Sequence, residues 1–401
     1  MVGPAVSADH VTTLIGVEVY LDHAASTPLR AETRAAMEPF LAGTYANPSG
    51  MHGAARAAKT ALETARETVA SVCGCEPGEV VFTGGGSEGD NLAIKGAAWA
   101  ARERTGADGV VTSAIEHKAV LAACSRLERE GFRVQRVPAG RDGTVDVGAL
   151  AGALDAGTGV VSLMLVNNET GIVQPVAEVA ELVRARAPRA VIHTDAVQAV
   201  SWLDLRTAAA SADLVSISGH KFGGPKGVGA LVVRDGVALV PLIEGGGHEG
   251  ERRAGTQNVA GIVGLAAAAG AVDEQRTVVG GRIAALRDRL QAALADAVPG
   301  FAVNGDPALR VPGILNGAFP DVDAETLLVA LDQQGVFAAS GSACTSGAID
   351  PSHVLLAMGL DPARARASVR FSLGHTTTAA DVDAAIEIVP RAVRRLVGAP
   401  A

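Results

Sequence analysis

Two residues with complementary chemistry each stand at the end of an apolar run. Asp195 closes the run 190–195, and Lys221 follows the run 213–218. Both runs are typical of buried strands, and open α/β sheets bind ligands at the carboxyl ends of their strands. A lysine and a nearby carboxylate supply what pyridoxal phosphate needs, because the amine bonds to the cofactor and the anion keeps the pyridine nitrogen protonated.

Lysine is scarce in this chain, which narrows the choice of amine, since arginine cannot act as an amine nucleophile. The lysines are Lys59, Lys95, Lys118, Lys221 and Lys226. Lys59 and Lys95 lie in alanine-rich helical patterns, where we expect them to be solvated. An isolated lysine at a strand end usually keeps its charge in water. Ser218 and His220 place hydrogen-bond donors beside Lys221, however, and favour a functional role for it.

Length and composition exclude several classes of protein. At 401 residues the chain exceeds the size at which one core keeps growing, so we expect two domains. A net charge of -9 and a pI near 5.5 argue against a nucleic-acid surface. The four cysteines are too irregularly spaced for a disulfide framework, and we recognise no signal sequence or membrane span. We therefore expect a cytoplasmic protein that binds neither nucleic acid nor membranes.

Strand and helix patterns alternate from residue 80 to about 217. The predicted strands lie near 80–83, 109–114, 133–137, 159–166, 190–194 and 213–217. The predicted helices between most of them lie near 118–130, 146–154 and 176–187. Such alternation favours an α/β fold with a largely parallel sheet that is covered on both faces.

Beyond residue 261 the pattern changes to longer helices and short strands. Two helices are predicted there, near 261–272 and 277–297. We place the domain boundary near 275. The large domain is then predicted to span 30–275, and 1–29 with 276–401 are predicted to form a smaller α+β domain.

The run 84–89 contains four glycines and satisfies the dinucleotide-binding spacing between a strand and a helix. A dinucleotide site also needs an acidic residue at the end of the next strand, but Asp108 precedes that strand and Glu116 lies too far along. What remains is a glycine turn that leads into a helix at Gly86 and Ser87, where backbone amides can bind phosphate. A monophosphate cofactor fits this turn as well as a dinucleotide does.

Further polar residues follow predicted strands or lie in loops. A histidine in the position of His117 is as often a core or surface residue whose hydrogen bonds are all made as it is a functional group that stacks on an aromatic cofactor. Asn168 is either a turn former or a neutral hydrogen-bond donor. Arg370 alternates with apolar residues on a predicted strand and could bind a carboxylate with both ends of its guanidinium. Most lone cysteines are buried and inert, but the small polar neighbours of Cys344 indicate an exposed loop.

Several motifs occur in a family-specific order along nearly the whole chain, from Tyr20 to about residue 376. They are Asn167-Asn168-Glu169, His193-x-Asp195-Ala196-x-Gln198, Ser218-Gly219-His220-Lys221, Gly255-Thr256 and Ser340-Gly341-Ser342-Ala343-Cys344. In this combination the chain closely resembles the cysteine desulfurases of the NifS/IscS type, which are fold-type I pyridoxal phosphate enzymes. The resemblance implies a large domain with a mainly parallel seven-stranded sheet.

The resemblance also implies a role for each matching residue. Lys221 would form the Schiff base with pyridoxal 5'-phosphate, and Cys344 would take the sulfur of the substrate as a persulfide. Asn168 and Arg370 would bind the substrate carboxylate. The remaining contacts to the cofactor would come from His117 stacked on the ring, Asp195 on the pyridine nitrogen, Gln198 on the ring hydroxyl, and Gly86, Ser87, Ser218, His220 and a partner subunit's Thr256 on the phosphate.

The implied enzyme is a homodimer that converts L-cysteine to L-alanine and passes the sulfur to an acceptor protein, with no metal expected. The acceptor stays open between iron–sulfur cluster scaffolds, transfer-RNA thiolation and other pathways. An aminotransferase or a dehydrogenase on a similar sheet has no use for the Cys344 loop. A selenocysteine lyase is a nearer alternative, and a catalytically idle interaction platform is the alternative from another class.

Overall fold

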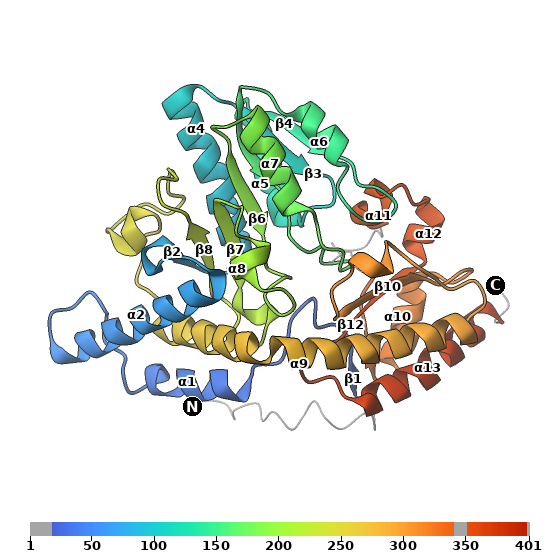
Figure 1. Ribbon diagram of the computed structural model, residues 1–401. Helices are drawn as coiled ribbons and strands as arrows, with labels where there is room; N and C mark the ends of the chain where they lie inside the picture. The colour runs from blue at the N-terminus through green and yellow to red at the C-terminus, as the bar shows by residue number, and fades with distance from the viewer. Residues whose placement is uncertain (1–17, 341–350, 399–401) are drawn as a thin grey trace, which may run out of the picture.

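The computed structural model describes residues 18–340 and 351–398 (Figure 1). The strands are β1 (Val19–Tyr20), β2 (Val80–Thr83), β3 (Gly109–Ser113), β4 (Arg133–Val137), β5 (Thr158–Ser162), β6 (Val191–Asp195), β7 (Leu214–Ser218), β8 (Gly229–Val233), β9 (Ala302–Val303), β10 (Ile314–Ala318), β11 (Val336–Phe337) and β12 (Ser368–Ser372). The α-helices are α1 (Ala31–Leu41), α2 (Gly53–Cys73), α3 (Gly86–Asn91), α4 (Ala97–Thr105), α5 (Lys118–Arg129), α6 (Val147–Ala153), α7 (Val176–Arg186), α8 (Leu205–Ala208), α9 (Val259–Ala297), α10 (Ala324–Asp332), α11 (His353–Ala357), α12 (Pro362–Arg366) and α13 (Ala379–Val397). None of these described helices has the length and apolarity needed to cross a bilayer.

The largest sheet has seven strands in the order β2-β8-β7-β6-β5-β3-β4. Neighbouring strands from β7 to β4 are parallel, whereas β8 is antiparallel to both β2 and β7. The predicted α/β fold with a mainly parallel seven-stranded sheet is therefore confirmed. The strand β8 was missing from the sequence prediction, because its apolar run directly follows the glycine-rich turn after Lys221.

Helices cover this sheet on both faces. On one face the core includes Leu62 of α2, Val179 of α7 and Leu265 of α9. On the other face it includes Ala97 of α4 and Leu127 of α5. Because both faces are buried, the central strands β5, β6 and β7 are almost fully buried along their length, and the polar residues inside β6 and β7, His193 and Ser216, hydrogen-bond to each other at 3.0 Å.

A second core is built on the antiparallel sheet β12-β10-β9. Its buried residues include Leu290 of α9, Leu315 of β10, Phe371 of β12 and Val389 of α13. The predicted pair of helices near 261–272 and 277–297 is wrong, because α9 is one continuous helix of 39 residues. Figure 1 shows α9 passing beneath both parts of the molecule.

The polar stretch 273–276, which lies between the two predicted helices, has partners elsewhere in the fold. Asp273 accepts hydrogen bonds from Arg206, and Gln275 accepts one from Arg30. The predicted domain boundary near 275 falls inside this helix, between Val272 in the first core and Ile283 in the second. The division at 275 stays a prediction.

Candidate active site

A cavity of about 730 Å³ opens where β6 and β7 end, and Arg370 of strand β12 also lines it. The predicted site residues that line it are Gly86, Ser87, His117, Asn168, Asp195, Gln198, Ser218, His220, Lys221 and Arg370. Thr256 is exposed and does not line this cavity in the part of the chain that the structure describes. Cys344 lies outside the described residues. The chain thus gathers most of the predicted site from segments far apart in sequence.

Lys221 ends a 3-10 turn directly after β7. Its Nζ donates hydrogen bonds to the carbonyl oxygens of Ala24 at 2.7 Å and Ala25 at 2.8 Å. Burial, and after it the positive charge of Arg370, lower the pKa of Lys221 to about 8. The amine therefore loses its proton far more easily than an ordinary lysine does.

Asp195 is the last residue of β6 and is buried. One of its carboxylate oxygens accepts a hydrogen bond from the amide of Val197 at 2.9 Å. Burial raises the pKa of Asp195, while His117, this amide bond and Lys221 act in the opposite direction. Asp195 is thus a carboxylate whose negative charge is balanced mainly by groups that face the cavity.

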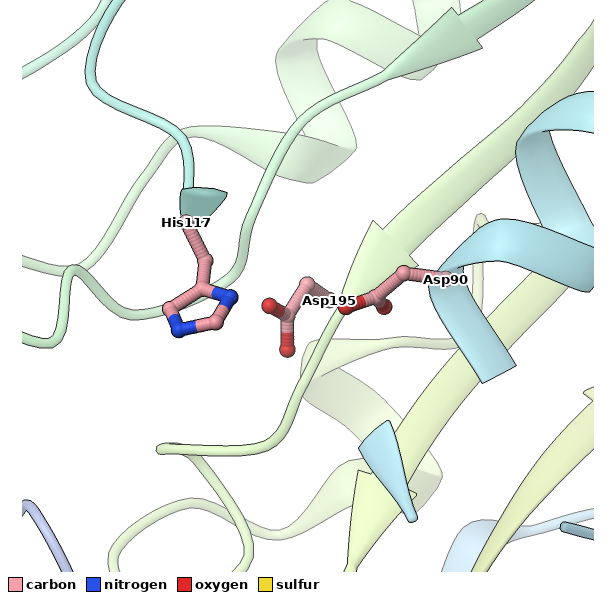
Figure 2. A group of neighbouring side chains, drawn as sticks. All are labelled: Asp90, His117 and Asp195. Carbon is pink, nitrogen blue, oxygen red and sulfur yellow. The ribbon is translucent and has the colours of Figure 1, made fainter. Parts of the chain in front are cut away.

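A second carboxyl, Asp90 of α3, lies behind Asp195 and was not predicted as a site residue. Figure 2 shows Asp195 between Asp90 and His117, and one polar atom from each of the three lies within 4.8 Å of the others. Burial and the nearby Asp195 raise the pKa of Asp90 well above its usual range, and Asp90 Oδ1 has no hydrogen-bond partner among the described residues. Burial raises the pKa of both carboxyls, and the closeness of Asp195 raises that of Asp90 further, so the pair favours a state with a single negative charge.

His117 precedes α5 and caps its first turn. The ring Nδ1 accepts a hydrogen bond from the amide of Ala119 at 3.2 Å, which leaves the proton of a neutral ring on Nε2. Burial lowers the pKa of His117 despite the opposing charge of Asp195. In this position the His117 ring is neutral and can donate a hydrogen bond from Nε2. Its acceptor nitrogen, Nδ1, is already bonded to the amide of Ala119.

The glycine turn before α3 packs closely on the end of β7. Gly85 has φ 142°, a conformation that residues with a side chain rarely adopt, and a Cβ on Gly86 would lie 2.7 Å from Val197 Cγ2. Ser87 and Ser218 bring hydroxyl groups to the same corner of the cavity. The turn therefore offers amide and hydroxyl donors around a hollow that a small anion can enter.

Another part of the cavity lining consists of Asp22, Asn168 and Arg370, which we call the rim. Arg370 on β12 donates from Nη1 to the carbonyl oxygen of Asn168 at 2.8 Å and from Nη2 to Asp22 Oδ1 at 2.7 Å. Its Nε is buried without a hydrogen-bond partner among the described residues. Gln198 also lines the cavity, and its Nε2 donates a hydrogen bond to the carbonyl oxygen of Ala24 at 2.8 Å.

The described residues on either side of 341–350 both reach the cavity, because Ala339 and His353 are among its lining residues. His353 is fixed there by a hydrogen bond of 2.9 Å between its Nε2 and the carbonyl oxygen of Glu116. The carboxyl of Glu116 is fully buried, and burial raises its pKa to about 8. From the sequence, its neighbour His117 was predicted as a site residue, Glu116 was weighed only as the acidic residue of a dinucleotide site, and His353 was not considered.

Comparison with known proteins places this arrangement in a family. A family model described as Aminotransferase class-V matches residues 19–385. A curated cysteine desulfurase of Cereibacter sphaeroides is 45% identical over 383 residues, which cover 94% of this chain and 96% of the relative. The chain belongs to the cysteine desulfurases of the class V aminotransferase family.

Solved structures agree with this membership of the cysteine desulfurases. A NifS-like protein matches with a TM-score of 0.88 at 34% identity over 94% of this chain and 99% of its own. A structure described as SspA in complex with cysteine matches with a TM-score of 0.78 at 34% identity over 90% and 99%. The predicted family, fold class and type of enzyme are therefore confirmed, and the roles of individual residues stay predictions.

Proposed function

We propose that this cysteine desulfurase holds pyridoxal 5'-phosphate in the cavity and uses Lys221, Asp195 and Cys344 to move sulfur from L-cysteine to the enzyme. The observation that carries the proposal is the pairing of an easily deprotonated Lys221 with a buried Asp195 at neighbouring strand ends. Both face one cavity that also contains an anion-binding turn and a buried arginine. L-alanine is the expected second product.

The residues present fit the cofactor. Asp195 would lie on the pyridine nitrogen and His117 against the ring, while Gly86, Ser87, Ser218 and His220 would hold the phosphate. A Cβ on Gly86 would lie 2.7 Å from Val197 Cγ2, so only glycine lets the turn pack this closely beside the cavity. When bound, pyridoxal phosphate supplies an electron sink that stabilises negative charge next to the substrate nitrogen.

Lys221 is the group of this chain that we propose moves the proton. Its lowered pKa gives a sizeable fraction of neutral amine near neutral pH, and only the neutral amine can act as a nucleophile or accept a proton from the substrate Cα. The carbonyl oxygens of Ala24 and Ala25 orient Nζ but place no carboxylate in contact with it. These two carbonyl oxygens thus position the Lys221 amine, and no carboxylate among the described residues bonds to it that would stabilise its protonated form.

Arg370 and Asn168 are proposed to bind the substrate carboxylate. Arg370 is held in place by Asp22, and its buried Nε still lacks a partner among the described residues. A charge-assisted bond from a guanidinium to a carboxylate is about twice as strong as a neutral hydrogen bond. The rim therefore recognises an amino acid by its carboxylate and sets the distance from that group to Lys221.

Cys344 is proposed to accept the sulfur: the C–S bond of the substrate breaks, an S–S bond forms on Cys344, and the former Cβ of the substrate takes up a proton. Ala339 and His353 bring the chain to the cavity on both sides of 341–350, which supports this assignment. The attacking sulfur must be a thiolate. His117 can accept the thiol proton on Nδ1 only after its 3.2 Å bond to Ala119 has opened.

The wider setting is also a proposal. Thr256 is exposed on its own chain, which supports a homodimer in which Thr256 of the partner subunit completes the phosphate site. An acceptor protein would then remove the persulfide sulfur. The described cysteines Cys73, Cys75 and Cys124 are all free thiols, which supports a reducing compartment such as the cytoplasm.

The decisive experiment replaces Cys344 with serine. Cys344→Ser should bind pyridoxal phosphate and show a spectral shift on adding cysteine, while alanine and sulfide production fall to background. Cys73→Ser and Cys124→Ser are the matched controls and should keep most of their turnover, because both thiols are buried away from the cavity. Wild-type enzyme given cysteine without reductant should carry one extra sulfur mass on the Cys344 peptide. Extra sulfur on another cysteine instead would refute the assignment.

A further inference from the structure

An acidic side chain stands where the cofactor's phosphate is proposed to bind. Glu88 lines the cavity beside the glycine turn, and its Oε2 accepts a hydrogen bond from the amide of Gly84 at 2.7 Å. Its other oxygen, Oε1, accepts a hydrogen bond from Arg253 Nε at 2.9 Å. The two side chains are about three-quarters buried, with 22% of Glu88 and 24% of Arg253 exposed. Glu88 thus bonds the turn on one side and an arginine on the other.

Among the described residues, Arg253 is the cation that forms an ion pair with Glu88, whereas Lys221 and Lys226 line the same cavity without an ion pair to Glu88. Burial, and then the charges of Lys221 and Lys226, lower the pKa of His220 to about 4, so its ring is neutral at neutral pH. The remaining phosphate-binding side chains, Ser87 and Ser218, are hydroxyls. A phosphate carries a charge of about -1.5 to -2 and is repelled by a nearby carboxylate unless that carboxylate is neutralised.

The loop that carries Arg253 is itself fixed to the sheet by a buried ion pair. Glu249 accepts hydrogen bonds from Arg66 Nη1 at 2.9 Å and Nη2 at 3.0 Å. The same carboxylate accepts a hydrogen bond of 3.0 Å from the backbone amide of Phe82, which lies on the edge strand β2. Glu249 adopts a φ of 49°, which a residue with a side chain keeps only where its surroundings hold it. Arg253 therefore approaches Glu88 from an anchored loop.

We propose that Arg253 and Glu88 form a positioning pair for the cofactor's phosphate, in which Glu88 shapes the glycine turn and Arg253 cancels its charge. The inference rests on the proposed placement of the phosphate at this turn. It gives Arg253 a role that the sequence did not suggest, because the residues around Arg253 have the pattern of a loop that precedes the helix α9. It also predicts an unusual pattern: removing the arginine alone is harmful, and removing the carboxylate charge as well repairs the damage.

The test is a double-mutant cycle read out as cofactor affinity. Full-length Arg253→Met, Glu88→Gln and the double variant are stripped of cofactor and titrated with pyridoxal 5'-phosphate and, separately, with pyridoxal, which has no phosphate. Arg253→Met should weaken binding of the phosphorylated cofactor by roughly tenfold or more and leave pyridoxal binding unchanged. Glu88→Gln keeps an acceptor for the Gly84 amide and should tighten binding. The double variant should return to within about threefold of wild type.

Controls separate this pattern from simple damage to the fold. Arg252→Met is the matched control, because Arg252 bonds the carbonyl oxygen of Gly78 rather than Glu88 and should bind both ligands as wild type does. Arg253→Lys should recover part of the affinity that Arg253→Met loses. Equal losses for both ligands, or a double variant weaker than Arg253→Met, would overturn the proposal. Wild-type protein that does not prefer the phosphorylated ligand would instead show that the proposed cofactor site is wrong.

Discussion

The wall of the cavity formed by Asp90, Asp195 and Lys221 differs from the rim in how its charges are balanced. On the wall, burial shifts the pKa of every titratable group, and none of the three groups forms an ion pair shorter than 3.6 Å among the described residues. On the rim, Arg370 already forms an ion pair with Asp22 at 2.7 Å. The wall is suited to exchanging protons, and the rim is suited to holding a substrate in a fixed position.

The largest effect should come from the wall amine. Lys221→Ala should reduce alanine and sulfide production to background, because no other lysine stands beside Asp195 at a strand end. Lys226→Ala is the matched control, since Lys226 lines the same cavity but is exposed, and it should keep most of the activity. Coupled assays of both products decide the point. Substantial turnover by Lys221→Ala would show that the wall does not perform the chemistry.

Asp195→Asn comes next on the same wall. The amide keeps the size of the side chain but cannot hold the pyridine nitrogen protonated, so kcat should fall on the order of a hundredfold or more. The visible band of bound cofactor should also weaken on dialysis. Asp195→Glu, which restores the charge at a shifted position, should recover part of the rate. A near-normal rate in Asp195→Asn would assign the carboxylate to another task.

A rim substitution should act on binding more than on chemistry. Arg370→Met should raise the KM for L-cysteine by about 10- to 100-fold with a smaller change in kcat, because a charge-assisted bond to the carboxylate is lost. Asp22→Asn should act in the opposite direction, since it releases Arg370 from its ion pair. Steady-state kinetics of both variants measure this contrast. A large fall in kcat with KM unchanged would place Arg370 with the wall.

The smallest effect concerns stability. The pKa of Lys221 falls from 10.5 to about 8 in the folded protein, so burying its charge destabilises the fold at pH 7. Cofactor-free Lys221→Met should therefore melt roughly 2–4 °C above wild type at pH 7. The gain should shrink as pH rises from about 8 to 10.5, because Lys221 is then neutral in the folded chain and later in the unfolded one. A gain that does not depend on pH would point to packing instead.

Sequence patterns predicted the central strands well, because β6 and β7 are buried runs that are rich in apolar residues and end in Asp195 and Ser218. They failed where the deciding contacts are distant in sequence. Two helices were predicted where α9 is continuous, and the residues between them, Asp273 and Gln275, accept hydrogen bonds from Arg206 and Arg30. Such long-range pairs leave no local signal in the chain.

The site shows the same division. Lys221, Asp195 and the glycine turn could be predicted because strand ends and glycine runs mark ligand sites in this class of sheet. Asp90 was missed, although its position three residues after Ser87 places it on the same helix face. The Glu88–Arg253 pair had no signal, since a carboxylate next to a phosphate turn makes sense only once the arginine is seen beside it.

The continuous helix α9 contributes residues to both cores and so connects them rigidly. Its 39 residues span about 58 Å, so the cores cannot move apart without bending it. Gly280 and Gly281 lie between Val272, which belongs to the first core, and Ile283, which belongs to the second, and they are closer to Ile283. A Cβ on Gly281 would meet nothing within 4 Å, so packing does not require a glycine there. Adjacent glycines weaken a helix. Bending of α9 near these glycines would therefore change the distance between the two cores, and with it the spacing of wall and rim.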